Sequence, residues 1–136
     1  MHWKTMGFAA LLLLVAHTAA AESALARCYE GAESRLQVRP CLEARLAEAE
    51  SALRRADART LSEMQALAGV TGRDDALMAY RAASQEFARF VTANCRWYGV
   101  RAEPGTGAGD IELDCRIRTT ESRAAELGEG RADRPE

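Results

Sequence analysis

The sequence PCLEARLAEAESALRRADARTLSEMQAL, residues 40–67, decides the fold class of this protein. Pro40 suits a first helical turn, where its missing N–H costs no hydrogen bond, and Gly69 to Gly72 supply turn residues that end the run. Between these limits, small or apolar side chains recur every three or four residues, which places them on one face of an α-helix. These side chains belong to Leu42, Leu46, Ala49, Leu53, Ala56, Thr60, Met64 and Leu67. The pattern predicts one long helix.

Two further helical patterns follow. The second starts near Asp74 or Asp75, either of which can cap a helix, and we expect Phe87 and Phe90 to lie in its core face. That face comprises Leu77, Tyr80, Ser84, Phe87, Phe90 or Val91, and Cys95. The third starts at Asp110 as its cap and carries Ile111, Cys115, Thr120, Ala124 and Leu127. We therefore predict an all-α fold with a three-helix antiparallel arrangement: one long helix, a second antiparallel helix and a shorter third.

The remaining segments lack helical periodicity. The stretch from Gly99 to Asp110 is rich in glycine and contains Pro104, which predicts a surface loop of about ten residues. Residues 128–136 are polar and aperiodic, so we expect a disordered tail there. The chain is thus predicted to form a single helical domain over residues 22–127.

Cys28, Cys41, Cys95 and Cys115 are an even number of cysteines, which favours two disulfides in an exported protein. Four cysteines allow three connectivities. The spacings of 13 and 20 residues favour the sequential pairing, Cys28 with Cys41 and Cys95 with Cys115. Each bridge would stabilise the fold by about 3 kcal/mol on a chain-entropy argument. A zinc site is disfavoured because the chain has no CxxC pair.

Residues 1–21 have the pattern of a cleaved export signal. Lys4 supplies a positive charge, residues 7–16 form an uncharged apolar run, and Ala19-Ala20-Ala21 supplies the small residues that a signal peptidase needs. The run is shorter than the roughly twenty residues that span a bilayer, so we expect no membrane span after cleavage. We expect a bacterial protein that is periplasmic or secreted.

Cleavage after residue 21 would remove His2, His17 and Lys4, which are all the histidines and lysines of the chain. The 17 remaining arginines are interleaved with 20 acidic residues, a pattern typical of solvated helix faces and not of a nucleic-acid-binding patch. Without histidine or lysine, the Ser-His-Asp and Cys-His mechanisms, imidazole metal sites and Schiff-base chemistry are excluded. We expect no metal and no cofactor.

Taken together, the cysteines and several motifs resemble the LprI-type lysozyme-inhibitor family. The matching elements are Cys28, Cys41-Leu42, Ala49-Glu50 with Leu53, Phe87-x-x-Phe90 leading to Cys95, the loop from Gly107 to Asp110, and the closing Cys115-x4-Thr120-x2-Arg123-x3-Leu127. The resemblance covers nearly all of the chain after the signal. The chain departs from the family pattern at Ser84, Phe87 and Val91, where glutamine, tryptophan and arginine are usual.

The resemblance implies an exported, disulfide-bonded helical domain that inhibits lysozyme by protein–protein contact and has no catalytic group. The cleft of lysozyme holds two carboxylates, and the loop from Gly99 to Asp110 is our candidate for entering it. The candidate partner-binding residues are Trp97, Tyr98, Arg101, Glu103 and Asp110. Arg101 would pair with a cleft carboxylate, and the two acids would steer association. Trp97 and Tyr98 are either packing residues or interface hot spots, and Asp110 is either a cap or a contact.

Two other classes of function stay open at this point. The chain could be an envelope protein that binds a different cell-wall-associated partner and has no affinity for lysozyme. A glycan hydrolase could work with two carboxylates alone, and Glu50 and Glu86 are the only acids close to an apolar stripe. Three amphipathic helices offer little concave surface for such an enzyme, so we predict a binding protein. The sequence does not indicate the oligomeric state.

Overall fold

The computed structural model describes residues 22–105 and 107–132, so the predicted signal peptide lies outside the described residues. The chain forms four helices, α1 (Ala24–Glu30), α2 (Arg35–Thr71), α3 (Asp75–Arg101) and α4 (Ala108–Ala132). No strand occurs within the described residues. The all-α class is confirmed, but the prediction of three helices is wrong by one.

The additional helix is α1, which precedes the long helix. Ser23 caps it, since its side-chain oxygen accepts a hydrogen bond from the backbone N–H of Ala26 at 3.1 Å. α1 has seven residues, which is too short to produce a recognisable helical periodicity. The Cys28–Cys41 disulfide, with 5.8 Å between the two Cα atoms, ties α1 to α2.

The long helix α2 starts earlier than predicted. It begins at Arg35, so Pro40 lies inside the helix and not in its first turn. Proline has no N–H to donate to the carbonyl four residues earlier, which here is that of Leu36. Leu36 is exposed, so this part of the helix is open to water, which can take the place of the missing donor. The predicted end is confirmed, because Gly72 adopts a left-handed conformation (φ 67°) and its N–H donates to the carbonyl of Ala68 at 2.9 Å.

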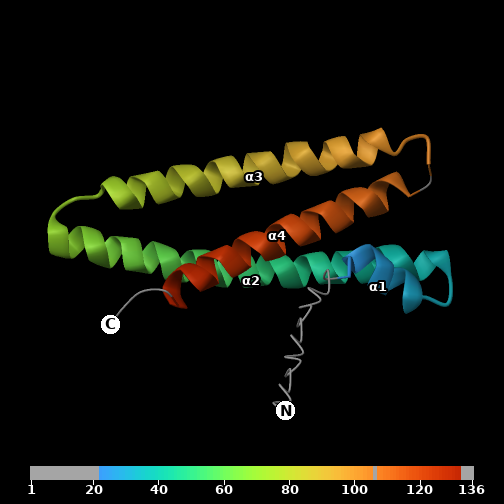
Figure 1. Cartoon of the computed structure of the whole chain (residues 1–136), viewed down its shortest axis with the longest axis horizontal. Helices are drawn as coiled ribbons and strands as arrows, with labels where there is room; N and C mark the ends of the chain where they lie inside the picture. Colours follow the sequence, from blue (N-terminus) through green and yellow to red (C-terminus); the bar gives the residue numbers. More distant parts are fainter. Residues whose placement is uncertain (1–21, 106, 133–136) are drawn as a thin grey trace, which may run out of the picture.

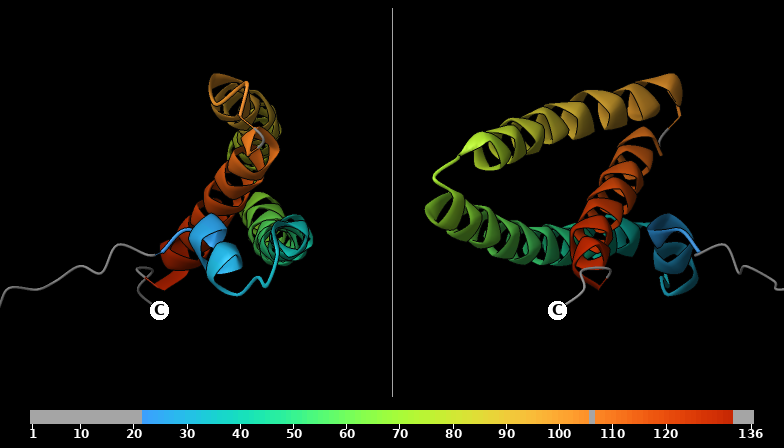
Figure 2. Two further views of the ribbon diagram at one scale, coloured as in Figure 1. Left: turned by 90° about the vertical axis from the view of Figure 1, so that its right-hand side faces the viewer. Right: turned by 60° about the vertical axis from the view of Figure 1, so that its left-hand side comes forward.

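The four helices form an open arrangement. α2 and α3 run in opposite directions and diverge from the turn that joins them, while α4 crosses the space between them diagonally (Figure 1, Figure 2). α4 packs against both long helices, and α1 packs against α2 and α4. The predicted antiparallel pair is present, but the third helix crosses that pair obliquely and so buries side chains against each of them.

The buried core lies where α4 meets its neighbours. The larger cluster joins α1, α2 and α4 through Ala24, Cys28, Val38, Leu42, Leu46, Leu113 and Ile117. A smaller cluster joins α3 and α4 through Val91, Cys95 and Cys115, with Phe87 and Tyr98 packed against it. Cys95 and Cys115 form the second disulfide, with a Cα–Cα distance of 5.4 Å. The sequential cysteine pairing is therefore confirmed.

The far ends of α2 and α3 contribute little to this core. Within the described residues of these two helices, no side chain beyond Ala56 in α2 and none before Val91 in α3 is buried. Phe90, expected in the core, is 53% exposed, because Val91 is the neighbour that faces α4. Leu67, at the end of the predicted apolar face of α2, is also exposed.

The end of the chain differs from the expected tail. α4 continues past Leu127 to Ala132, so residues 128–132 are helical and only residues 133–136 of the predicted tail lie outside the described residues. Glycine lowers helix stability by about 1 kcal/mol relative to alanine but does not prevent a helix from continuing. The composition of this segment was thus a poor guide to its backbone.

Candidate functional site

The predicted partner-binding residues lie around the corner where α3 ends and α4 begins. Trp97 and Tyr98 are in the last two turns of α3, and their rings meet edge to face with 4.7 Å between centroids and 76° between planes. The guanidinium of Arg101 lies over both rings, 4.9 Å from the centroid of Trp97 and 5.2 Å from that of Tyr98. The structure therefore brings three of the five predicted residues into direct contact.

The two aromatic residues have different environments. Tyr98 packs against the cluster formed by Val91 and the Cys95–Cys115 disulfide. Trp97 is 53% exposed and lies on the outer side of α3. The environment of Tyr98 is that of a packing residue. Trp97 instead offers a large aromatic surface to solvent, as an interface residue would.

Glu103 and Asp110 are near this corner but make no hydrogen bond or ion pair with the aromatic residues among the described atoms. Glu103 is exposed in the connection between the helices. Asp110 is the third residue of α4, and its backbone N–H donates to the carbonyl of Gly107 at 3.1 Å. The prediction that Asp110 caps α4 is wrong, although a carboxylate in the first turn still interacts favourably with the helix dipole.

The predicted loop from Gly99 to Asp110 is also much shorter than expected. α3 extends to Arg101 and α4 begins at Ala108, which leaves residues 102–107 as the connection. Gly99 is buried in α3, where a Cβ atom would lie 3.1 Å from the carbonyl oxygen of Ala108 and 3.2 Å from the Cβ of Glu112. Its missing side chain lets the two helices approach closely, so this glycine belongs to the helix contact and not to a loop.

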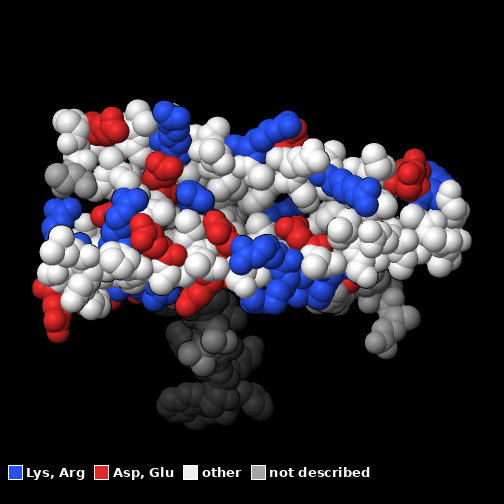
Figure 3. Space-filling model, turned by 180° about the vertical axis from the view of Figure 1, so that it is seen from behind, with Lys and Arg blue, Asp and Glu red and all other residues white. Residues whose placement is uncertain are grey.

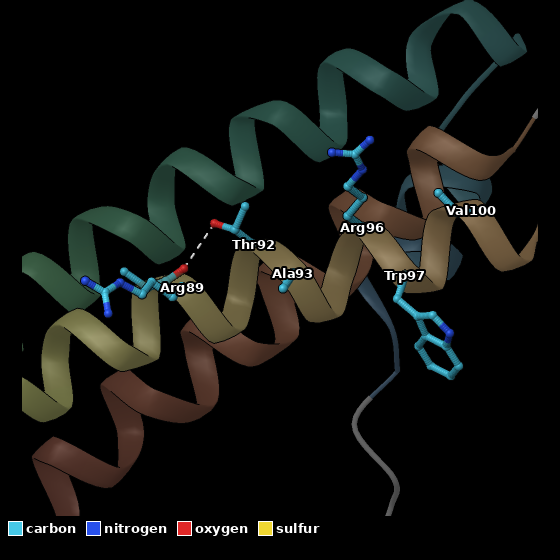
Figure 4. A pocket seen from close by; sticks show the side chains of 7 residues that line it. Arg89, Thr92, Ala93, Arg96, Trp97 and Val100 are labelled. Carbon is cyan, nitrogen blue, oxygen red and sulfur yellow. Dashed lines mark hydrogen bonds between the residues drawn. The ribbon is translucent and has the colours of Figure 1, made fainter.

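A shallow groove runs along the outer side of α3 next to Trp97. Figure 4 shows that its lining comes from α3 alone, with Trp97 pointing away from Arg89 and Arg96. The lining residues are Ala88, Arg89, Thr92, Ala93, Arg96, Trp97 and Val100. The groove ends at the same corner as the cation–π cluster, so Trp97 belongs to both features.

A second, more enclosed crevice lies between the helices, where α2, α3 and α4 diverge. Its volume is about 300 Å³. It is lined by Glu50, Leu53, Arg54, Asp57, Ser84, Phe87, Ala88, Val91, Thr92, Arg116, Thr120 and Arg123. The sequence offered no sign of this crevice as a site, because its residues lie on three helices and meet only in the folded chain.

Charged side chains of both signs are mixed across the surface (Figure 3). Several arginines form ion pairs within their own helix, as Arg39 does with Glu43 at 3.0 Å and Arg123 with Glu126 at 2.8 Å. This agrees with the interleaved pattern in the sequence.

Neither glutamate considered for glycan hydrolysis is buried. Glu50 borders the crevice and forms an ion pair with Arg116 at 3.4 Å, and Glu86 is exposed and forms one with Arg89 at 2.6 Å. The two residues lie on different helices, and Glu50 lines the crevice while Glu86 does not. The part of the chain that the structure describes also contains no cluster of acidic, cysteine or histidine side chains able to hold a metal ion.

This helical chain with two disulfides matches a known protein family. The family model of the lysozyme inhibitor LprI matches residues 26–127. The chain belongs to the LprI lysozyme inhibitor family. The LprI match includes all four cysteines and every predicted partner-binding residue. No significant match is found among curated proteins or among solved structures.

Membership of the LprI family agrees with several features of the fold. The family is described as an inhibitor, a role that requires a binding surface and no catalytic group. Two disulfides are typical of proteins that fold in an oxidising compartment. None of the helices within residues 22–132 is long and apolar enough to cross a bilayer.

Proposed function

We propose that this protein is a non-catalytic, exported inhibitor that binds lysozyme through the corner between α3 and α4. This α3–α4 corner comprises residues 97–110 and contains Trp97, Tyr98, Arg101, Glu103 and Asp110. The observation that carries the proposal is the combination of family membership with a half-exposed tryptophan under an arginine at a projecting corner of the fold (Figure 1).

Arg101 is suited to meet a carboxylate of the lysozyme cleft. Its guanidinium lies over the rings of Trp97 and Tyr98, and such stacking leaves the N–H groups at the edge of the guanidinium free for a bidentate contact. No acidic side chain of the described residues forms an ion pair with Arg101 within 4.0 Å. The stacking therefore orders the long side chain before binding, which lowers the entropy lost on association.

The other residues of the corner have supporting roles in this proposal. Trp97 supplies apolar contact area of the kind that dominates interface energies, and Tyr98 holds the corner against the Cys95–Cys115 disulfide. Glu103 and Asp110 supply negative charge that would steer approach to a cationic enzyme. In this proposal, the α3–α4 corner therefore supplies contact area, a fixed geometry and a steering charge for lysozyme, and it uses no reacting group.

A lysis assay tests this function. Oxidised protein at micromolar concentration is added to a cell-wall suspension together with c-type lysozyme or, separately, g-type lysozyme, and turbidity is followed. We expect slower clearing with at least one enzyme. Unchanged lysis with both would overturn the proposal and favour the alternative, an exported envelope protein with a different partner and no affinity for lysozyme.

Matched variants place the site. Arg101→Gln and Trp97→Ala should each weaken inhibition about tenfold or more, as expected for interface hot spots. Arg81→Gln removes the same charge from the exposed far part of α3 and should leave inhibition unchanged. Full inhibition by both corner variants would show that lysozyme binds elsewhere on the chain.

A further inference from the structure

The crevice between α2, α3 and α4 has the chemistry of a second binding site. Its volume of about 300 Å³ lies at the lower end of the range for small-molecule pockets. One part of its wall is apolar, formed by Leu53, Phe87 and Val91. Three arginines, Arg54 from α2 with Arg116 and Arg123 from α4, line the same space.

The three arginines that line this crevice differ in how their charge is paired. The lining contains two acids, and a third acid, Glu126, pairs with Arg123 from outside the lining. Asp57 already accepts a hydrogen bond from the hydroxyl of Tyr80, and Glu50 is held by a single 3.4 Å contact with Arg116. Arg54 forms no hydrogen bond or ion pair among the described residues. Among these three arginines, Arg54 is therefore the one that can meet an external anion without first leaving an acidic partner.

One of these arginines, Arg123, is held in place more firmly than a free surface side chain. Arg123 is only 18% exposed; its guanidinium lies over the ring of Phe87, 5.7 Å from the centroid, and also forms an ion pair with Glu126 at 2.8 Å. Such a partly buried, ordered cation loses little side-chain entropy when it binds an anion. Electrostatic attraction is stronger here than at an exposed site because water screens it less.

Two hydroxyl groups add polar contacts to the apolar wall. Thr120 is buried, and the side-chain oxygen of Ser84 is buried without a hydrogen-bond partner of normal geometry. Both residues line the crevice.

We propose that this crevice binds a small amphipathic organic anion. The anionic group, a carboxylate or a phosphate, would be held by Arg54 and Arg116, which offer forked N–H donors that match such groups. The apolar body would lie against Leu53, Phe87 and Val91. This site is separate from the α3–α4 corner proposed for lysozyme and shares no residue with it.

Titration followed by NMR tests the site. The oxidised protein, labelled with ¹⁵N, is titrated with octanoate, octyl phosphate or the neutral analogue octanol, and amide shifts are recorded. We expect saturable shifts in residues 50–57, 84–92 and 116–123 with at least one anion, and binding of octanol that is about tenfold weaker. The two anions show which head group the site prefers.

Two variants distinguish a loss of anion binding from a loss of folding. Arg54→Gln removes an exposed side chain that has no partner, so it should fold normally and weaken anion binding about tenfold. Arg59→Gln removes the same charge from an exposed position of α2 outside the crevice and should leave the affinity unchanged. The absence of saturable shifts at millimolar anion, shifts confined to residues 93–100, or equal affinities for both variants would each overturn the proposal.

Discussion

The carboxylate of Asp114 in α4 accepts a hydrogen bond from the backbone N–H of Leu25 in α1 at 2.8 Å, across 89 positions of the sequence. Leu25 lies in the first turn of α1, where backbone N–H groups have no partner within the helix and negative charge is favourable. One side chain of α4 therefore completes the capping that Ser23 begins. α1 depends on this long-range contact as well as on its disulfide.

Replacing Asp114 should loosen α1 specifically. Asp114→Ala removes the acceptor and should cost about 1 kcal/mol of stability, the usual cost of losing a helix cap. Amide hydrogen exchange of residues 24–30 should accelerate, whereas Asp114→Asn, which keeps an acceptor oxygen, should show a smaller change. If exchange in α1 is the same in wild type and Asp114→Ala, the contact does not stabilise the helix.

Truncation of the central core residues should be much more costly. Leu42 and Ile117 are completely buried and belong to the cluster that joins α1, α2 and α4, so Leu42→Ala and Ile117→Ala should each lower the free energy of unfolding by about 2–5 kcal/mol. Urea unfolding measures this directly. Leu67→Ala, at an exposed position of the same helix as Leu42, serves as the control and should cost far less; equal losses at Leu42 and Leu67 would contradict the assigned core.

A separate prediction concerns the connectivity of the two disulfides and their contribution to stability. Mass spectrometry without reductant should show the loss of four protons, and peptide mapping should link Cys28 to Cys41 and Cys95 to Cys115. The paired replacement Cys95→Ala with Cys115→Ala should lower stability by about 2–5 kcal/mol, since it releases the end of α3 from α4. Free thiols or crossed peptides would disprove this connectivity.

Tyr80 should make stability depend on pH in the alkaline range. Burial, followed by the hydrogen bond to Asp57, raises the pKa of Tyr80 above its ordinary value of 10.0. Since the folded state holds this proton more tightly, the contribution is complete below pH 10 and is lost as the pH rises from there through the folded pKa. Unfolding curves of wild type and Tyr80→Phe should therefore differ in their decline above pH 10; identical declines would show that Tyr80 has no such role.

The far ends of α2 and α3 should open more readily than the rest of the molecule. Residues 62–71 and 75–84 contribute no residue to the buried core, and few buried apolar contacts mean a low free energy of local opening. Their amides should exchange faster than those of residues 38–49 and 111–120. Uniform protection along both long helices would contradict this expectation.

Local patterns in the chain predicted much of this fold. The three-to-four-residue spacing of Leu42, Leu46 and Ala49 identified the buried face of α2, and Gly72 ends that helix as the turn residues indicated. The even count and spacing of the cysteines predicted the observed pairs. Each of these features depends on residues close in sequence, or on loop length, and so needs no knowledge of distant contacts.

The candidate site could be predicted only in part. Trp97 and Arg101 were identified as interface residue types, but their stacking depends on α3 continuing to Arg101, through Gly99. Glycine reads as a loop residue in isolation; here close packing against Ala108 and Glu112 in α4 favours a residue without a side chain. No local signal distinguishes these two uses of glycine.

The amino-acid pattern alone was sufficient for the helical class and the disulfide pairing, because these follow from local periodicity and from the number and spacing of the cysteines. The tertiary structure decided which residues that are distant in sequence come into contact. Asp114 reaches Leu25, and Arg54, Arg116 and Phe87 come to line one crevice, because α4 crosses obliquely between two diverging helices. Such contacts join residues far apart in sequence, and only the packing of helix against helix determines which of them meet.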